Sequence, residues 1–256
     1  MEIDIQVVIQ IARKAGEEIL KIYEREFTIE EKEDRSPLTE ADKRANEVIL
    51  EGLQSNYPDI PFITEESKAL PYEERKDWGQ FWLIDPLDGT KEFIKKNGEF
   101  TVNIALVEDG VPVLGVVFQP AANRLFYAQK SIGAFKVDDG GEPEKLEGGK
   151  HFQDQNPVKI VASRSHMSPE TEQFVEELRS QGKEIELTSS GSSLKLCLVA
   201  EGSADVYPRF APTMEWDTGA AHAVCLEAGR QVNNRETGSP LQYNKENLLN
   251  PWFIVE

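Results

Sequence analysis

The chain has 256 residues, 39% of them apolar, and a formal net charge of −18 at pH 7. A chain of this length forms one large domain or two lobes around a sizeable core. The negative charge argues against nucleic-acid polymers and anionic membranes as partners, because both would repel the protein. No apolar run approaches the ~18 residues of a membrane span, and the first residues lack the pattern of a secretion signal. Cys197 and Cys225 lie on apolar faces of helix-like patterns, which favours reduced core residues in a cytoplasmic protein over a disulfide or catalytic thiol.

The first half of the chain predicts helices packed against antiparallel strands. Apolar residues at helical spacing predict helices at residues 4–23 and 40–54. Short apolar runs predict strands at 62–64 and 81–84. Asp109-Gly110 between two apolar runs predicts a hairpin of strands 100–108 and 111–118, followed by strands at 125–128 and 133–137.

The second half has a different rhythm. Residues 138–156 are polar and rich in Gly and Glu, which predicts an exposed loop. After it, predicted strands at 159–162, 184–187 and 204–207 alternate with predicted helices at 169–180, 193–201 and 217–228. We therefore expect an N-terminal α+β lobe, residues 1–155, and a C-terminal α/β lobe, residues 156–256.

The sequence Asp-Pro-Leu-Asp-Gly-Thr at residues 85–90 directly follows the predicted strand 81–84. Pro86 stiffens this segment and Gly89 allows a tight turn, so Asp85 and Asp88 would leave the strand close together. Carboxylate and carbonyl oxygens are the ligands that Mg²⁺ prefers, which suggests a metal site. The alternative is an ordinary surface turn, because Asp, Pro and Gly are all common turn residues.

Other acids occupy similar junctions between elements. Glu65 and Glu66 follow the strand at 62–64, and Asp217 opens the last long helix. Thr39 and Asp42 resemble a helix capping box, and Asp217 could equally be an N-cap. Two like charges ~4 Å apart cost about 4 kcal/mol at an effective dielectric constant of 20, a cost that bound cations remove. Together the acids predict one cluster that binds two or three divalent cations.

These ordered motifs resemble the lithium-sensitive, Mg²⁺-dependent inositol monophosphatase-like superfamily. Residues 85–90 match its first signature, and Trp216-Asp217 followed by small residues matches its second. The Glu-Glu pair at 65–66 and the Thr-x-x-Asp at 39–42 come in the expected order. The resemblance covers nearly the whole chain and implies a two-lobed, layered αβαβα sandwich that binds Mg²⁺.

Details point to one branch of this superfamily. Lys91-Glu92-Phe93 follows the first motif, where inositol phosphatases usually have Thr-Asn, and this resembles the 3′(2′),5′-bisphosphate nucleotidases. Residues 192–195 and 204–209 resemble the same branch. Two departures, Ala211 and the order of residues 219–221, exchange only small residues. The resemblance implies hydrolysis of the 3′-phosphate of adenosine 3′,5′-bisphosphate to AMP, and the same reaction on its 5′-phosphosulfate relative, within sulfate assimilation. An inositol monophosphatase or sugar phosphatase on the same scaffold is the nearest alternative.

The resemblance also implies roles for individual residues. Thr90, supported by Asp42, would orient and deprotonate the attacking water. The implied Mg²⁺ ligands are Glu65, Asp85, the Leu87 carbonyl, Asp88 and Asp217. The implied substrate contacts are Glu65, Leu87, Asp88, Gly89, Thr90, His166, Ser192, Lys195, Arg209 and Asp217. Among these, Ser192, Lys195 and Arg209 would bind the 5′-phosphate, although without the resemblance Lys195 and Arg209 would be taken as ordinary surface charges.

The sequence says less about assembly and location. The resemblance is compatible with a monomer or a homodimer. We expect a cytoplasmic protein, and some bacterial relatives associate peripherally with the inner membrane. No basic amphipathic segment that would anchor such an association is present in the sequence.

Overall fold

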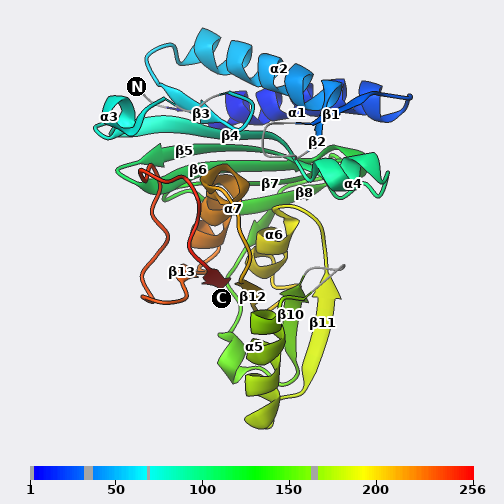
Figure 1. Cartoon of the computed structure of the whole chain (residues 1–256), viewed down its shortest axis with the longest axis vertical. Coiled ribbons are helices and arrows are strands. Elements are labelled where there is room, and N and C mark those ends of the chain that lie inside the picture. Colours follow the sequence, from blue (N-terminus) through cyan, green and yellow to red (C-terminus); the bar gives the residue numbers. More distant parts are fainter. Residues whose placement is uncertain (1–2, 32–36, 68–69, 163–166) are drawn as a thin grey trace.

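The computed structural model describes residues 3–31, 37–67, 70–162 and 167–256. Its elements form successive layers in an αβαβα order (Figure 1). Helices α1 (Ile5–Tyr23) and α2 (Glu40–Asn56) form the first layer, on one face of a large sheet. Helices α6 (Leu194–Ala200) and α7 (Glu215–Glu227) cover its other face. A set of short strands follows, with α5 (Pro169–Ser180) outermost. The predicted layered α+β sandwich is confirmed.

The large sheet has seven strands in the order β3-β4-β5-β6-β7-β8-β9. Only the β3–β4 pair is parallel. The carboxyl ends of β3 and β4 therefore meet at the same edge of the sheet, and the residues after both strands become neighbours. The strands are β3 (Phe62–Thr64), β4 (Gln80–Asp88), β5 (Thr101–Glu108), β6 (Val111–Gln119), β7 (Arg124–Gln129), β8 (Gly133–Asp138) and β9 (Glu144–Leu146).

The hairpin predicted at Asp109-Gly110 is present between β5 and β6. Both turn residues have positive φ angles, +48° and +77°, as a two-residue hairpin turn of the primed type requires. Glu108 pairs with Val111 across the turn. The local turn signal therefore fixed the pairing next to the turn, and the register of β5 and β6 shifts by one residue between Val107 and Leu106.

Two predictions for the middle of the chain are wrong in part. Residues 138–156 are not one open loop, because β9 and a short 3₁₀ helix, η2 (Phe152–Asp154), lie within them. The reason is that Leu146 and Phe152, apolar residues in a polar stretch, are each only 5% exposed. The strand predicted at 204–207 is displaced, since β12 covers Tyr207–Arg209.

The second layer of strands combines two small sheets. β10 (Val158–Ala162) and β11 (Ile185–Ser189) pair in parallel, and β12, β14 (Phe253–Val255) and β13 (Val232–Asn234) form an antiparallel sheet. A parallel bridge between Ile160 and Val206 connects the two. Figure 1 shows α5 lying outside these strands. The sequence did not predict β13 and β14, which have three residues each.

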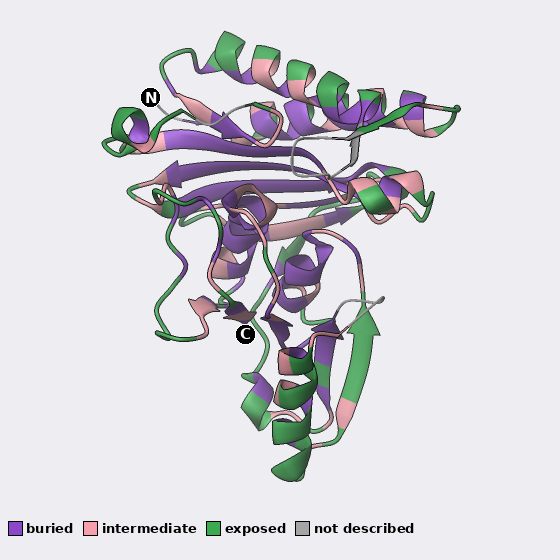
Figure 2. Ribbon diagram, viewed as in Figure 1, coloured by how far each residue is buried: buried purple, intermediate pink, exposed green. Residues whose placement is uncertain are grey.

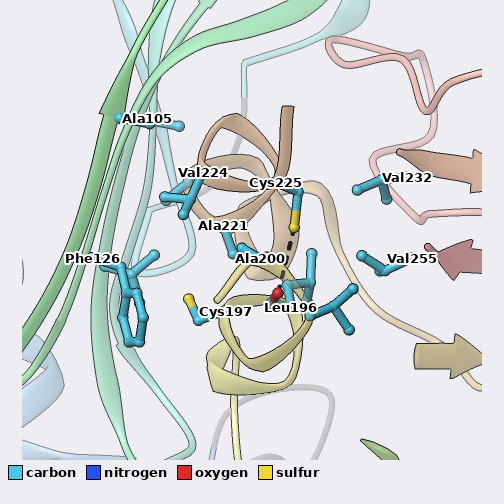
Figure 3. Packing of buried hydrophobic residues seen from close by; sticks show 14 of the residues in the cluster. Ala105, Phe126, Leu196, Cys197, Ala200, Ala221, Val224, Cys225, Val232 and Val255 are labelled. Atoms are coloured by element: carbon cyan, nitrogen blue, oxygen red, sulfur yellow. Dashed lines mark hydrogen bonds between the residues drawn. The ribbon is translucent and has the colours of Figure 1, made fainter. Parts of the chain in front are cut away.

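The core is centred on the large sheet, whose strands are buried along most of their length (Figure 2). The outward faces of α1, α2 and α5 are exposed. Figure 3 shows part of the cluster between sheet and helices, where Phe126 of β7 faces Cys197 of α6 and Val224 of α7. This cluster includes residues from both sides of residue 155, and the division into two lobes there stays a prediction.

Both cysteines belong to this apolar cluster, as predicted. Cys197 and Cys225 are free thiols with no exposed surface. The Cys225 thiol donates a hydrogen bond to the Leu196 carbonyl oxygen at 3.5 Å (Figure 3). Burial raises the pKa of Cys225 to about 12, so the thiol stays protonated and unreactive at neutral pH.

Helix α7 packs so closely on β6 at Gly115 that a larger side chain there should destabilise the protein. A methyl group at Gly115 of β6 would lie 2.1 Å from the Ala220 carbonyl oxygen of α7. We expect Gly115→Ala to lower the free energy of unfolding by about 2–3 kcal/mol, because a backbone must move. Gly79→Ala, where the nearest atom is 3.7 Å away, should change it by less than about 0.5 kcal/mol. Urea unfolding measures both variants, and equal stabilities would contradict this packing.

Candidate active site

The first motif forms the irregular end of β4. The sequence predicted a tight turn directly after residue 84, but β4 continues to Asp88. Asp85 lies opposite Asn103 of β5 and Asp88 lies opposite Thr101, so β4 contains one extra residue at this point. Such a β-bulge redirects side chains and is common beside active sites. Pro86 suits the bulge because it has no N–H to donate to the ladder.

A short helix begins immediately after the bulge. Gly89 has a φ of +91° and caps α4 (Thr90–Ile94). A methyl group there would lie 3.1 Å from the Glu99 carbonyl oxygen and 3.3 Å from Ser192 Cβ. Both the positive φ and the close approach require glycine at this position.

Three aspartates from two distant parts of the chain form a cluster. Each of Asp85, Asp88 and Asp217 offers a carboxylate oxygen, and these oxygens all lie within 4.8 Å of one another. The Glu65 N–H donates to the Ile84 carbonyl oxygen at 3.1 Å, which places Glu65 beside Asp85 at the shared edge of β3 and β4. The structure therefore brings together the acids that the sequence singled out.

Burial and mutual repulsion favour the protonated forms of this cluster. Burial, together with the charges of Glu65, Asp88 and Asp217, raises the pKa of Asp85 well above its ordinary value. Burial raises the pKa of Asp217 to about 8 and that of Asp88 to about 6. A site of this kind holds either protons or cations at neutral pH. Its donors are all oxygens, which fits a hard cation such as Mg²⁺.

Asp217 does not cap α7, contrary to one reading of the sequence. Met214 occupies the N-cap position, and Asp217 lies in the first turn of the helix. The Asp217 Oδ2 accepts a hydrogen bond from the Met214 N–H at 2.8 Å. This bond orients the carboxylate at the cluster and satisfies an amide at the start of the helix.

Thr90 and Asp42 also lie together, as predicted. The Thr90 hydroxyl donates to Asp42 Oδ1 at 3.2 Å. The other oxygen, Asp42 Oδ2, accepts from the Thr39 N–H at 2.8 Å and from the Thr39 hydroxyl at 2.6 Å. The capping box and the contact with Thr90 therefore use the two oxygens of the same carboxylate, which is 1% exposed.

The sequence reasoning did not identify Ser193. Its N–H donates to Asp88 Oδ2, and its hydroxyl donates to Asn103 Oδ1 at 2.8 Å. Thr101 Oγ1 lies 2.9 Å from the same hydroxyl. Ser193 thus connects the bulge, β5 and the start of α6. The sequence analysis predicted a role for the neighbouring Ser192 instead. Nothing in the sequence indicates which of the two adjacent serines contacts Asp88.

Lys195 and Arg209 line the same cavity as α4. The cavity has a volume of about 790 Å³, and Glu65, Asp88, Thr90 and Asp217 line it as well. Lys195 is 9% exposed, so it is not an ordinary surface charge. Its ammonium donates to the Ser192 and Ser190 carbonyl oxygens at 2.7 and 3.3 Å. Burial lowers the pKa of Lys195 to about 8.

Of the other predicted substrate residues, Arg209 and Ser192 line the cavity, whereas His166 is not among the described residues. Arg209 Nη2 donates to the Pro212 carbonyl oxygen at 3.0 Å at the side of the cavity. Ser192 lines the cavity next to Gly89. His166 lies outside the described residues, so its predicted contact with the nucleotide stays a prediction.

Comparison with known proteins identifies the family. The inositol monophosphatase family matches residues 2–251. The chain belongs to this family. It is 46% identical to the 3′(2′),5′-bisphosphate nucleotidase CysQ of Salmonella typhimurium, over 98% of both chains, and 45% identical to that of Escherichia coli, over 97% of both. The predicted superfamily and its bisphosphate nucleotidase branch are confirmed.

Solved structures agree with this assignment. The crystal structure of CysQ from Bacteroides thetaiotaomicron has a TM-score of 0.86 and 48% identity, covering 98% of this chain and 96% of the other. The extragenic suppressor protein suhB from Bartonella henselae gives 0.76 and 26%, covering 96% and 92%. No helix in the described part of this inositol monophosphatase family member is long and apolar enough to cross a membrane.

The raised pKa values predict how stability without metal depends on pH. Burial raises the pKa of Asp88 and Asp217 from 3.8 to about 6 and about 8 in the folded state. Between about pH 4 and 8 these two carboxyls hold more protons in the folded protein than in the unfolded chain, so their contribution to stability falls as pH rises. The buried His222, whose pKa burial lowers to about 3, acts in the opposite direction below pH 6.5. We therefore expect the melting temperature in EDTA to decrease from about pH 6.5 to 8, and excess Mg²⁺ to raise it most at the upper end.

Calorimetric melting across this pH range tests the expectation. Asp217→Asn is the informative variant, because it removes one titrating group and should flatten the decline in EDTA. A wild-type melting temperature that is constant or rises with pH over this window would contradict the electrostatic description of the cluster.

Proposed function

We propose that this protein is a Mg²⁺-dependent phosphomonoesterase of sulfate assimilation. Its substrate is adenosine 3′,5′-bisphosphate, from which it removes the 3′-phosphate to give AMP, and it treats the 5′-phosphosulfate relative likewise. The observation that carries the proposal is the aspartate cluster beside a cavity whose lining includes the cationic residues Lys195 and Arg209. The similarity to named bisphosphate nucleotidases supports this choice of substrate.

The proposed Mg²⁺ ligands are carboxylates and one carbonyl at the edge of the large sheet. Two or three bound ions would neutralise phosphate charge and lower the pKa of a bound water. Removal of the cations would restore the repulsion that raises the pKa of Asp85. The proposed ligands are Glu65, Asp85, the Leu87 carbonyl, Asp88 and Asp217.

Thr90 and Asp42 are proposed to position the attacking water. The Thr90 hydroxyl donates its hydrogen to Asp42, so its oxygen can accept a hydrogen bond from water. The water oxygen forms the new bond to phosphorus while the bond from phosphorus to the ribose 3′-oxygen breaks. One hydrogen of the water stays with the new phosphate and the other passes as a proton through Thr90 to Asp42. An equivalent proton returns from Asp42, by way of solvent water, to the ribose oxygen as that oxygen leaves. Thr39 holds Asp42 in place for this relay.

The second lobe is proposed to select the substrate. Lys195 and Arg209 carry the positive charges that a 5′-phosphate needs, and Ser192 supplies a hydroxyl donor. A bound phosphate would stabilise the charged form of Lys195, whose pKa burial lowers to about 8. The amides of Gly89 and Thr90 would contact the phosphate that is cleaved.

We place the protein in the cytoplasm, where its two buried cysteines would remain reduced. The alternatives of monomer and homodimer stay open predictions.

A substrate panel tests the function directly. Phosphate release should be fastest with adenosine 3′,5′-bisphosphate, and we expect kcat/KM for 3′-AMP to be roughly 10- to 100-fold lower, since a charged contact worth about 1.5–3 kcal/mol is lost. EDTA should abolish the activity. Faster hydrolysis of inositol 1-phosphate than of the bisphosphate would contradict the proposal and favour the inositol phosphatase alternative.

Arg209→Ala separates recognition of the 5′-phosphate from catalysis in the same assay. It should reduce the preference for the bisphosphate over 3′-AMP while leaving hydrolysis of 3′-AMP nearly unchanged. The exposed Arg44→Ala on α2 serves as the charge-matched control. An unchanged preference would show that Arg209 does not bind the 5′-phosphate.

Thr90 variants test the proposed proton relay. Thr90→Ala removes the hydroxyl that bonds Asp42, and we expect kcat to fall by roughly 100- to 1,000-fold, within the range of general acid–base contributions. Thr90→Ser keeps the hydroxyl and should retain most of the activity. Steady-state kinetics at saturating Mg²⁺ measures both, and similar kcat values for the two variants would exclude the relay.

A further inference from the structure

A second carboxylate in the first turn of α7 is fully buried but lies outside the metal cluster. Glu215 is 0% exposed and precedes Asp217 by two residues. Its Oε2 accepts from the Asn244 N–H at 2.7 Å, and its Oε1 accepts from the Lys245 N–H at 3.1 Å and from the Lys245 ammonium at 2.5 Å. A buried charge is tolerated only with such partners, so Glu215 ties α7 tightly to residues 244–245.

The segment that Glu215 contacts is also bonded to Arg75. Arg75, at the end of α3 (Tyr72–Arg75), is 2% exposed. Its Nη1 donates to Asn244 Oδ1 at 2.7 Å and its Nη2 donates to the Glu246 carbonyl oxygen at 3.0 Å. The Asn244 side-chain amide returns a bond to the Arg75 carbonyl oxygen at 2.7 Å. Arg75 therefore holds residues 244–246 independently of their contacts with α7.

The rest of the segment closes around the start of α7. The Glu215 N–H donates to the Leu248 carbonyl oxygen at 2.9 Å, and the Asn250 side-chain amide donates to the Met214 carbonyl oxygen at 2.8 Å. Met214 in turn donates its N–H to Asp217. Residues 244–250, which we call the strap, thus bind the same helical turn that carries Asp217.

The strap has a consequence for the aspartate cluster. Ionised carboxylates ~4 Å apart repel by about 4 kcal/mol at an effective dielectric constant of 20, so the ionised form that accepts a cation favours displacement of Asp217 from Asp85 and Asp88. The strap resists that displacement because it holds the turn through the ion pair of buried Glu215 with Lys245, whose side chain is 30% exposed. We propose that Glu215 is a positioning residue that pre-organises Asp217 for a divalent cation, which rests on the proposed role of Asp217 as a metal ligand.

Metal affinity distinguishes positioning from a purely structural role. Glu215→Gln keeps the shape of the side chain but removes the charge that holds Lys245, and Lys245→Met removes the partner. We expect Mg²⁺ to bind both variants roughly 10- to 100-fold more weakly, as when groups that orient metal ligands are lost. Calorimetric titration of the purified, folded protein with Mg²⁺ alone measures this, together with the melting temperature in EDTA.

The control is a glutamate of similar burial far from the cluster. The side chain of Glu201 is 8% exposed and pairs with Lys136 at 2.9 Å, so Glu201→Gln should leave Mg²⁺ affinity unchanged. If Glu215→Gln and Lys245→Met lower only the melting temperature and bind Mg²⁺ as the wild type does, the positioning role is wrong. If Asp217→Asn itself binds Mg²⁺ normally, the proposed metal site fails instead.

Discussion

Repulsion among buried carboxylates is the constraint on which this structure depends. Asp85 is buried, Asp88 and Asp217 are partly buried at the wall of the cavity, and the raised pKa values of all three express the cost of holding them together. A protein gains no stability from such an arrangement unless something positive fills it. The surrounding contacts stabilise this unfavourable arrangement. The Ser193 N–H donates to Asp88, the Met214 N–H donates to Asp217, and the strap binds the first turn of α7 through Glu215.

The layered fold brings these groups together from distant parts of the chain. Because β3 and β4 are parallel, Glu65 and Asp85 leave the large sheet at the same edge. The bulge then turns the end of β4 toward the helical layer, and α7 brings Asp217 to meet it across the sheet face. The second strand layer adds Arg209, so the proposed metal and specificity groups face one cavity.

Much of the fold and of the acidic cluster could be predicted from the sequence, because the local sequence patterns there are strong. Amphipathic periodicity located α1 and α2, the Asp109-Gly110 turn fixed a hairpin, and four ordered motifs indicated the acidic cluster. Signals failed where tertiary contacts decide the outcome. The bulge in β4 depends on pairing with β5, and the choice of Ser193 over Ser192 depends on how α6 packs against the sheet. Glu215 gave no sign of its partner thirty positions later, Lys245.

The most direct test of the account is the proton balance of cation binding. Titration of the metal-free protein with Mg²⁺ at pH 7, in buffers of different ionisation enthalpy, counts the protons released. Because burial raises the pKa of Asp217 to about 8 and that of Asp85 well above its ordinary range, the account predicts net proton release that declines as pH rises above 8. Tight Mg²⁺ binding without proton release, or no binding at all, would contradict it.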